Sequence, residues 1–336
     1  DFYTFDTSFD FVAPILPALP PILEACGDRN DLVGGIVQLY VAIAEFQVSF
    51  LSAQQMHAFN EACLQLLRTF AHVEEGAAHS TESNAFLREL KATWLRDHLL
   101  SLLQLLLHLA RKDVVDFATE TRAGQMDVAD VVLYGLSIVQ PLVTPESLQF
   151  PPLATEFFGL LGWLVESYPQ KVSVMSRDIL DPMMACLAHG VQQADSDIAR
   201  VSVEAIDALA TFQIGTMQGS TDYLLKRTHP QMLGLFLQSM LDMLLFKQFN
   251  RGVLEASCDA LHSLMWCEQH QFHALMTQVM EQQAVMSHRE EVSRATETLL
   301  KVVTESGPAL QRSAKMQFRK HMRDFLGSVR PFLVKI

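Results

Sequence analysis

Apolar residues recur at steps of three and four positions along nearly the whole chain, which is the spacing of one face of an α-helix. Within residues 54–73, a regularly spaced apolar set is Phe59, Cys63, Leu66, Leu67 and Phe70. No run of alternating β-branched residues bounded by Asn-Gly or Asp-Gly occurs in the sequence, so the usual signal of a β-hairpin is missing. The pattern predicts an all-α fold.

The predicted helices form six successive pairs after residue 30. Polar stretches separate some of them, and residues 73–84 and 215–228 are predicted to be surface loops. At about 50 residues a pair, the spacing is close to the roughly 40–47 residues of HEAT and armadillo repeats. The pairs are residues 32–51 with 54–73, 85–112 with 128–143, 153–168 with 178–192, 195–212 with 230–246, 251–267 with 271–284, and 287–305 with 308–332.

A series of this kind has a physical cause. A helix pair with apolar residues on both helices cannot cover them alone, so each pair stacks on the next and the core runs along a superhelix. Residues 99–107 and 132–143 contain no charged side chain, which fits helices that are covered on several sides. A single compact bundle is the alternative, but six pairs in strict order favour an α-α superhelix, a HEAT-repeat solenoid. Residues 1–30 are then the end of a preceding repeat or a connector, and residues 308–336 form a C-terminal capping helix.

The longest predicted helix, residues 85–112, has two distinct faces. Its apolar face consists of Leu99, Leu102, Leu103, Leu106 and Leu109. Its polar stripe consists of Asp97, Ser101, Gln104, His108 and Arg111. This division predicts an amphipathic helix whose leucine face lies in the core.

Charge narrows the choice of partners. The 336-residue chain has 25 Lys and Arg against 38 Asp and Glu, a net charge of −13, and 49% of its residues are hydrophobic. Such a surface argues against a general binder of nucleic acid or of anionic membranes, because phosphate affinity needs basic residues. Electrostatically steered partners should be basic. Residues 311–336 differ from the rest, with seven Lys and Arg against Asp324 alone.

The five cysteines and the hydropathy pattern bear on the cellular compartment. The cysteines are odd in number and lack CxxC spacing, which is typical of reduced thiols in the cytosol or nucleus. Residues 32–51 are long enough to span a bilayer, but Gln38, Glu45 and Ser49 share one helical stripe, which favours a buried soluble helix. The chain has no initiator Met and no basic-then-apolar leader, so we expect it to be a piece of a longer protein.

Signatures of catalysis are missing from the sequence. It contains no GxGxxG, GxxxxGK[ST], GxSxG, HExxH or EF-hand spacing, so we expect neither an enzyme nor a bound cofactor. The best metal candidate is the set Cys258, His262, Cys267, His270 and His273. Because Cys258 falls in the apolar series Leu254, Cys258, Leu261 and Met265, a core role fits it better than zinc binding.

Acidic residues supply the remaining candidate site. Asp197, Arg200, Glu204 and Asp207 follow steps of three, four and three, which predicts one exposed stripe on a helix. Other acidic clusters are Glu74 with Glu75, and Asp113, Asp116, Glu120, Asp127 and Asp130. A stripe of this kind is usually only a solvated face. In a chain of net charge −13, we predict that Asp197, Glu204, Asp207, Glu74 and Glu75 line a surface for a basic partner.

One segment resembles a known family. Residues 130–172 read DVVLYGLSIVQPLVTPESLQFPPLATEFFGLLGWLVESYPQKV: a helix, a Pro-ended turn, an L-x-F-P-x-L run, an aromatic pair and a Pro-Gln-Lys stop. This arrangement resembles the C-terminal part of exportins, which are members of the importin-β or karyopherin family of nuclear transport receptors. Residues 316–335 resemble the terminal helix of such a receptor more weakly.

The resemblance implies a HEAT-repeat receptor that binds protein cargo together with Ran-GTP. It implies passage through the nuclear pore by binding nucleoporin Phe-Gly repeats, and shuttling between nucleus and cytoplasm. The implied cargo includes translation factor 5A, whose hypusine side chain is a long amine that an acidic surface would suit. No direct contact with nucleic acid or a membrane is implied. The runner-up is a HEAT-type scaffold without a transport role.

Overall fold

The computed structural model of the chain describes residues 9–78, 85–113, 128–219, 224–247, 249–281, 288–306 and 311–333. Within these residues all regular secondary structure is helical and no strand is present, which confirms the all-α prediction. The chain divides into two compact units, Asp1–Leu160 and Leu161–Ile336. None of the helices in the described ranges is both long enough and apolar enough to cross a bilayer.

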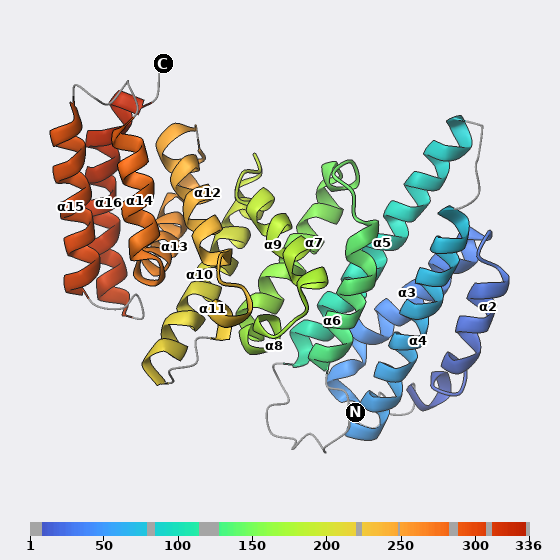
Figure 1. Cartoon of the computed structure of the whole chain (residues 1–336). Helices are drawn as coiled ribbons and strands as arrows, with labels where there is room; N and C mark the ends of the chain where they lie inside the picture. Colours follow the sequence, from blue (N-terminus) through green and yellow to red (C-terminus); the bar gives the residue numbers. More distant parts are fainter. Residues whose placement is uncertain are drawn as a thin grey trace. The chain divides into compact units, whose positions relative to one another are not determined.

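Unit 1 is built as two layers of helices. In one layer α3 lies beside α5, and in the other α4 lies between α2 and α6 (Figure 1). Each layer therefore alternates helices from successive pairs, as in a HEAT-repeat array. The elements are η1 (Leu16–Ala18), α2 (Leu19–Ala25), α3 (Asn30–Phe46), η2 (Val48–Phe50), α4 (Ala53–Ala78), α5 (Ala85–Asp113), α6 (Val128–Val139), η3 (Gln140–Leu142), η4 (Ser147–Gln149) and most of α7 (Pro151–Ser167).

The centre of unit 1 is an aromatic and leucine core. The rings of Tyr40 and Phe59 stack with their centroids 6.0 Å apart, and Phe9 meets Phe59 edge to face at 6.1 Å. The whole leucine face predicted for α5 is buried, and so are Leu105 and Leu107 outside it. Helix α5 is therefore covered on more sides than a simple amphipathic helix, because α3 and α6 both pack on it.

Two polar residues of α5 face α3, Ser101 of the predicted polar stripe and His98 beside that stripe. Ser101 is buried and accepts a hydrogen bond from the Gln38 amide at 2.7 Å. His98 lies 3.4 Å from the carbonyl oxygen of Asn30, above Gly34. Ser101 and His98 thus supply polar contacts between two packed helices, since a buried hydroxyl or imidazole needs a hydrogen-bond partner.

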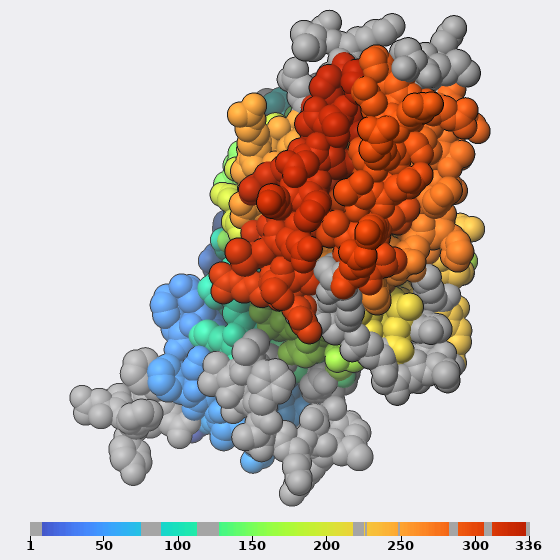
Figure 2. Space-filling model, turned by 90° about the vertical axis from the view of Figure 1, so that its left-hand side faces the viewer, coloured from blue at the N-terminus to red at the C-terminus, as the bar shows by residue number. Residues whose placement is uncertain are grey.

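Unit 2 repeats the layered plan. Helices α10, α13 and α16 follow one another in one layer, while α9, α12 and α14 form the other and α15 packs on α14 and α16 (Figure 1). Figure 2 looks onto the surface that α15 and α16 make in orange and red. The elements are α8 (Pro169–Ser173), α9 (Arg177–Gly190), α10 (Ser196–Gly219), α11 (Leu224–Thr228), α12 (Met232–Phe246), η5 (Arg251–Val253), α13 (Leu254–Cys267), α14 (Gln269–Met280), α15 (Arg289–Ser306) and α16 (Arg312–Leu333).

Two predicted loops are wrong in part. Helix α4 continues to Ala78 and so includes the first six residues of the stretch 73–84 that was expected to be a loop. Helix α10 continues to Gly219, and the short helix α11 follows within the predicted loop 215–228. Ile214 is fully buried and keeps the apolar period beyond Phe212, so packing offsets the modest cost of Gly215 inside a helix.

Candidate protein-binding surface

The N-terminal half of α10 carries the exposed part of the predicted acidic stripe. Asp195 caps the helix, because its side-chain oxygen accepts hydrogen bonds from the backbone N–H groups of Asp197 and Ile198 at 2.8 and 3.3 Å. The Asp197 and Glu204 side chains are 80% and 42% exposed. The guanidinium of Arg200 bridges them, 3.1 Å from the Asp197 carboxylate and 3.5 Å from that of Glu204.

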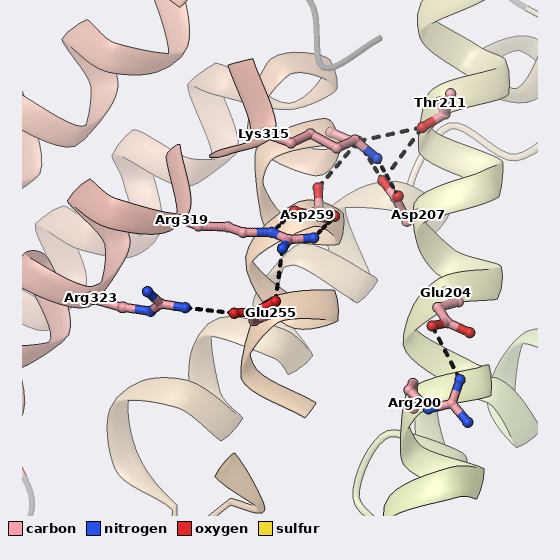
Figure 3. A network of polar contacts seen from close by, with 10 residues as sticks. Arg200, Glu204, Asp207, Thr211, Glu255, Asp259, Lys315, Arg319 and Arg323 are labelled. Atoms are coloured by element: carbon pink, nitrogen blue, oxygen red, sulfur yellow. Dashed lines mark hydrogen bonds and ion pairs between the residues drawn. The ribbon is translucent and has the colours of Figure 1, made fainter. Parts of the chain in front are cut away.

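Asp207 does not belong to the exposed stripe, which corrects the sequence prediction. Its side chain is only 18% exposed, and one of its carboxylate oxygens lies 2.6 Å from the Lys315 ammonium. The other oxygen accepts hydrogen bonds from the hydroxyls of Ser263 at 2.6 Å and Thr211 at 3.4 Å. Helical spacing correctly placed Asp207 on the same face of α10 as Asp197 and Glu204. At the level of Asp207, however, α13 and α16 cover that face (Figure 3).

The basic residues of α16 form a ladder of ion pairs with acidic residues of α10 and α13. Below Lys315, the Arg319 guanidinium makes two 2.7 Å bonds to the Asp259 carboxylate and one 2.8 Å bond to Glu255 (Figure 3). Arg323 lies 2.7 Å from Glu255. The hydrogen bond to Asp259 is the main cause that raises the pKa of Arg319. Most of the positive charge on this face of α16 is therefore neutralised within the protein.

The ladder lies beside an apolar contact. The His262 ring of α13 stacks on the Phe318 ring of α16 with centroids 4.7 Å apart and planes 8° apart. Burial, and then repulsion by Lys315, lowers the pKa of His262 to about 4. The imidazole is therefore neutral at pH 7 and acts as an aromatic surface for Phe318.

Glu166 at the end of α7 is a further acidic residue that the sequence analysis missed. Its pKa is raised, first by desolvation and then by repulsion from Glu204 and Asp207. No spacing rule connects a residue of α7 with one of α10, so only the fold reveals that these carboxylates interact. We call Glu166 and Asp197, which are exposed, and Glu204, which is partly exposed, the acidic surface of unit 2.

The other predicted acidic residues belong to unit 1. Glu74 of α4 is half-buried, and desolvation raises its pKa against the opposing effect of Lys91. The side chains of Glu75 and Asp113, and all of Asp116, Glu120 and Asp127, lie outside the described residues. Asp130 lies in the first turn of α6, where an acidic side chain favours the helix dipole.

The predicted metal candidates are not gathered into one site. Cys258 and His262 are buried in α13, and burial raises the pKa of the Cys258 thiol to about 12. The Cys267 thiol lies 3.6 Å from the Ala210 carbonyl oxygen, whereas His270 and His273 are exposed on α14. Over the described residues, no three His, Cys, Asp or Glu side chains are placed to hold a metal ion. The burial of Cys258 therefore fits a residue of the hydrophobic core better than a metal ligand.

A cavity of about 470 Å³ lies between α9 and α12. Its apolar lining comes from Met184, Met232, Phe236 and Leu235, and the Leu235 side chain is 61% exposed. Arg177, Asp181 and His229 are among the polar residues that line it. The His229 side chain is buried, and its Nε2 atom has no hydrogen-bond partner among the residues that the structure describes. The cavity combines an apolar wall with an unsatisfied polar atom, which is typical of a binding pocket.

Comparison with known families agrees with the fold. Residues 130–172, which carry the resemblance to exportins, lie mainly in α6, α7 and α8. Among exportins, this segment predicts exportin 4, with exportin 7 as the nearest rival. The model of the Exportin-4 family matches residues 2–336. The prediction of an exportin 4 C-terminal region is confirmed, and the chain belongs to the Exportin-4 family.

Proposed function

We propose that this chain, as part of a nuclear transport receptor, binds protein cargo together with Ran-GTP and carries that cargo from the nucleus to the cytoplasm. The observation that supports this proposal is the match to the Exportin-4 family over residues 2–336. The layered helix pairs support it further, because such arrays present long surfaces for protein partners. The proposed role is binding and release, without a chemical step performed by this chain.

The acidic surface of unit 2 is our proposed contact for basic cargo. Asp197 and Glu204 are exposed, and only Arg200 neutralises them among the described ion pairs. Glu166 is repelled by Glu204 and Asp207, so a cation placed beside these carboxylates would relieve the repulsion. The hypusine side chain of translation factor 5A is a cation of this kind. Asp207 is not part of this surface, because its carboxylate already forms an ion pair with the Lys315 ammonium.

The cavity between α9 and α12 is our proposed contact for a nucleoporin Phe-Gly repeat. Its volume of about 470 Å³ is ample for a phenyl ring, and its methionine and leucine side chains adapt easily to an aromatic partner. The Nε2 atom of His229 offers a hydrogen-bonding position beside that ring. The cavity and the acidic surface lie in the same unit, so both proposals are testable by substitutions in unit 2.

The experiment that tests the transport role measures cargo capture against the state of Ran. Immobilised full-length receptor is incubated with translation factor 5A, alone, with Ran-GDP, and with Ran locked in its GTP form. We expect cargo to be retained strongly only with Ran-GTP, since the two ligands of an export receptor bind cooperatively. Equal capture in all three conditions would favour the alternative, a HEAT-type scaffold without a transport role.

A further inference from the structure

A second surface of unit 2 has the opposite charge. A groove of about 700 Å³ runs between α16 and the segment that enters α13. We call it the basic groove, and the residues that define it are Phe249, Arg251, Arg323, Leu326, Gly327 and Arg330. It brings three guanidinium groups to one place in a chain whose net charge is −13. This concentration of positive charge is not explained by the proposed cargo surface.

Arg330 is held in a fixed orientation. Its guanidinium lies over the Phe249 ring, 4.8 Å from the centroid, and donates a 2.9 Å hydrogen bond to the carbonyl oxygen of Lys247. Because a guanidinium carries five N–H donors, this one bond leaves donors for a ligand. Stacking and a backbone contact thus orient Arg330 before any ligand arrives, which lowers the entropy cost of binding.

The three arginines are only partly neutralised. Arg323 pairs with Glu255 at 2.7 Å, and Glu255 is shared with Arg319. Arg251 is exposed and Arg330 is half-buried, and neither makes an ion pair with any residue in the described part of the chain. The groove therefore carries excess positive charge, whereas the ladder higher on α16 is balanced by Asp207, Asp259 and Glu255.

The groove also has an apolar wall and an open backbone position. Leu326 is almost fully buried at its base, and the Phe249 ring flanks it. At Gly327 an added Cβ atom would meet no heavy atom within 4 Å, so helix backbone forms part of the wall. A side chain placed at residue 327 would enter the groove without disturbing the packing of α16.

We propose that the basic groove binds an acidic segment of a partner protein, with carboxylates on Arg251 and Arg330 and a large apolar side chain against Leu326 and Phe249. Arginine pairs with carboxylates through two parallel hydrogen bonds, which favours a side-chain carboxylate as the ligand. The apolar wall favours a peptide over a polyanion that carries charge alone. The partner has the opposite charge from the cargo proposed for the acidic surface, so the two surfaces select different proteins.

The test uses the whole chain and a fluorescein-labelled hexapeptide of sequence Asp-Glu-Leu-Phe-Glu-Asp, followed by fluorescence anisotropy. The double variant Arg251→Glu with Arg330→Glu should lower affinity by about tenfold or more. Gly327→Glu, which removes no existing side chain, should do the same. The matched control is Arg312→Glu with Lys320→Glu, which changes the net charge equally on exposed positions of α16 and should alter affinity by less than about twofold.

Three results would overturn the proposal. The first is equal loss of affinity in the groove and control variants, because net charge alone would then explain binding. The second is unchanged affinity in the Gly327→Glu variant. If the double arginine variant melts at a lower temperature, its loss of affinity could reflect unfolding, and the Gly327→Glu variant then decides the test by itself. The third is a preference for vesicles containing phosphatidylinositol bisphosphate over the peptide, which would assign the groove to a lipid headgroup.

Discussion

Lys315 and Asp207 lie 108 residues apart in the chain, yet the Lys315 ammonium is 2.6 Å from the Asp207 carboxylate. The pair joins α16, the last helix, to α10. Helix α13 lies between these two helices in the same layer. Arg319 and Arg323 continue the contact on α13, so the position of α16 depends on charge as well as on its apolar face. Helical spacing predicted that Asp207 would face a partner, but in the structure Asp207 forms an ion pair within the protein.

The first prediction concerns this pair. Replacing Lys315 by Met leaves the Asp207 carboxylate without its cation and should lower the free energy of unfolding by about 2 kcal/mol, less than for a fully buried pair because each side chain is about one-fifth exposed. Lys320→Met, at an exposed position of α16, is the control and should change stability by less than about 0.5 kcal/mol. Denaturant titration measures both.

A double variant separates the interaction energy of the Asp207–Lys315 pair from the effects of the two single substitutions. Asp207→Asn together with Lys315→Met should cost less than the sum of the two single changes, because neither residue is then left charged and unpaired. Additive costs, or a Lys315→Met variant as stable as Lys320→Met, would mean that the ion pair does not hold α16 in place.

The second prediction concerns pH. The folded-state pKa of His262 is about 4, against about 6.5 for an unfolded histidine. Between these values the unfolded chain binds more protons, so the stability from neutral His262 is present above pH 6.5 and is lost as pH falls toward 4. Lowering the pH from 7 to 5 should therefore cost about 2 kcal/mol through this group.

The unfolding free energy is measured for the wild type and for His262→Gln, each at pH 7 and at pH 5. The change between the two pH values in the wild type, minus the change in the variant, gives the contribution of His262. The exposed His270→Gln variant is the control and should show the pH dependence of the wild type. A His262→Gln variant with the same pH dependence as the wild type would refute the assignment.

The third prediction tests the packing of α5. Leu103 is fully buried and Gln104 is half-buried one position later. Leu103→Asp places a carboxylate in the core and should destabilise unit 1 by several kcal/mol, whereas Gln104→Asp should cost about 1 kcal/mol or less. Thermal melts followed by circular dichroism compare them, and equal melting temperatures would show that the leucine face is misassigned.

The fourth prediction tests the cavity between α9 and α12. Leu235→Asp places a charge in the wall of the cavity at a side chain that is 61% exposed, so the fold should tolerate it. Affinity for a nucleoporin Phe-Gly peptide should fall by about tenfold. Met316→Asp on α16 is equally exposed and serves as the control. Parallel losses in both variants, measured by isothermal titration calorimetry, would remove the cavity from the proposal.

Local patterns predicted the helices better than the contacts between them. The leucine face of α5 and the apolar series of α13 follow from helical spacing, because both reflect burial along one element. The extension of α10 was missed because residues 215–228 were predicted to be a surface loop, although Ile214 continues the buried face. Spacing shows which residues share a face of a helix, but it does not show which distant helix covers that face.

The acidic residues illustrate the same limit. Asp197, Glu204 and Asp207 lie on one stripe of α10, and the sequence treats them alike. In the structure Lys315, Ser263 and Thr211 surround Asp207, whereas Asp197 and Glu204 stay exposed. Glu166 approaches them from α7, a relationship that requires the packing of two helices. Tertiary contact therefore decides which part of a predicted stripe is open to a partner.

The most direct test of the acidic surface is the rate at which cargo associates. Stopped-flow fluorescence would measure binding of translation factor 5A in the presence of Ran-GTP, for the wild type and for Asp197→Lys with Glu204→Lys. The control is Glu290→Lys with Glu297→Lys, which changes the net charge equally on exposed positions of α15. Asp207 stays unchanged, because its substitution would disturb α16.

Exposed charges act mainly on the encounter between two proteins, and salt screens them beyond about 8 Å at physiological ionic strength. We expect the association rate to fall about tenfold in the Asp197 and Glu204 variant and to change by less than about twofold in the control. The difference between the two variants should shrink as salt is raised. An unchanged association rate in a variant that remains folded would contradict this expectation and would remove the acidic surface from the cargo site.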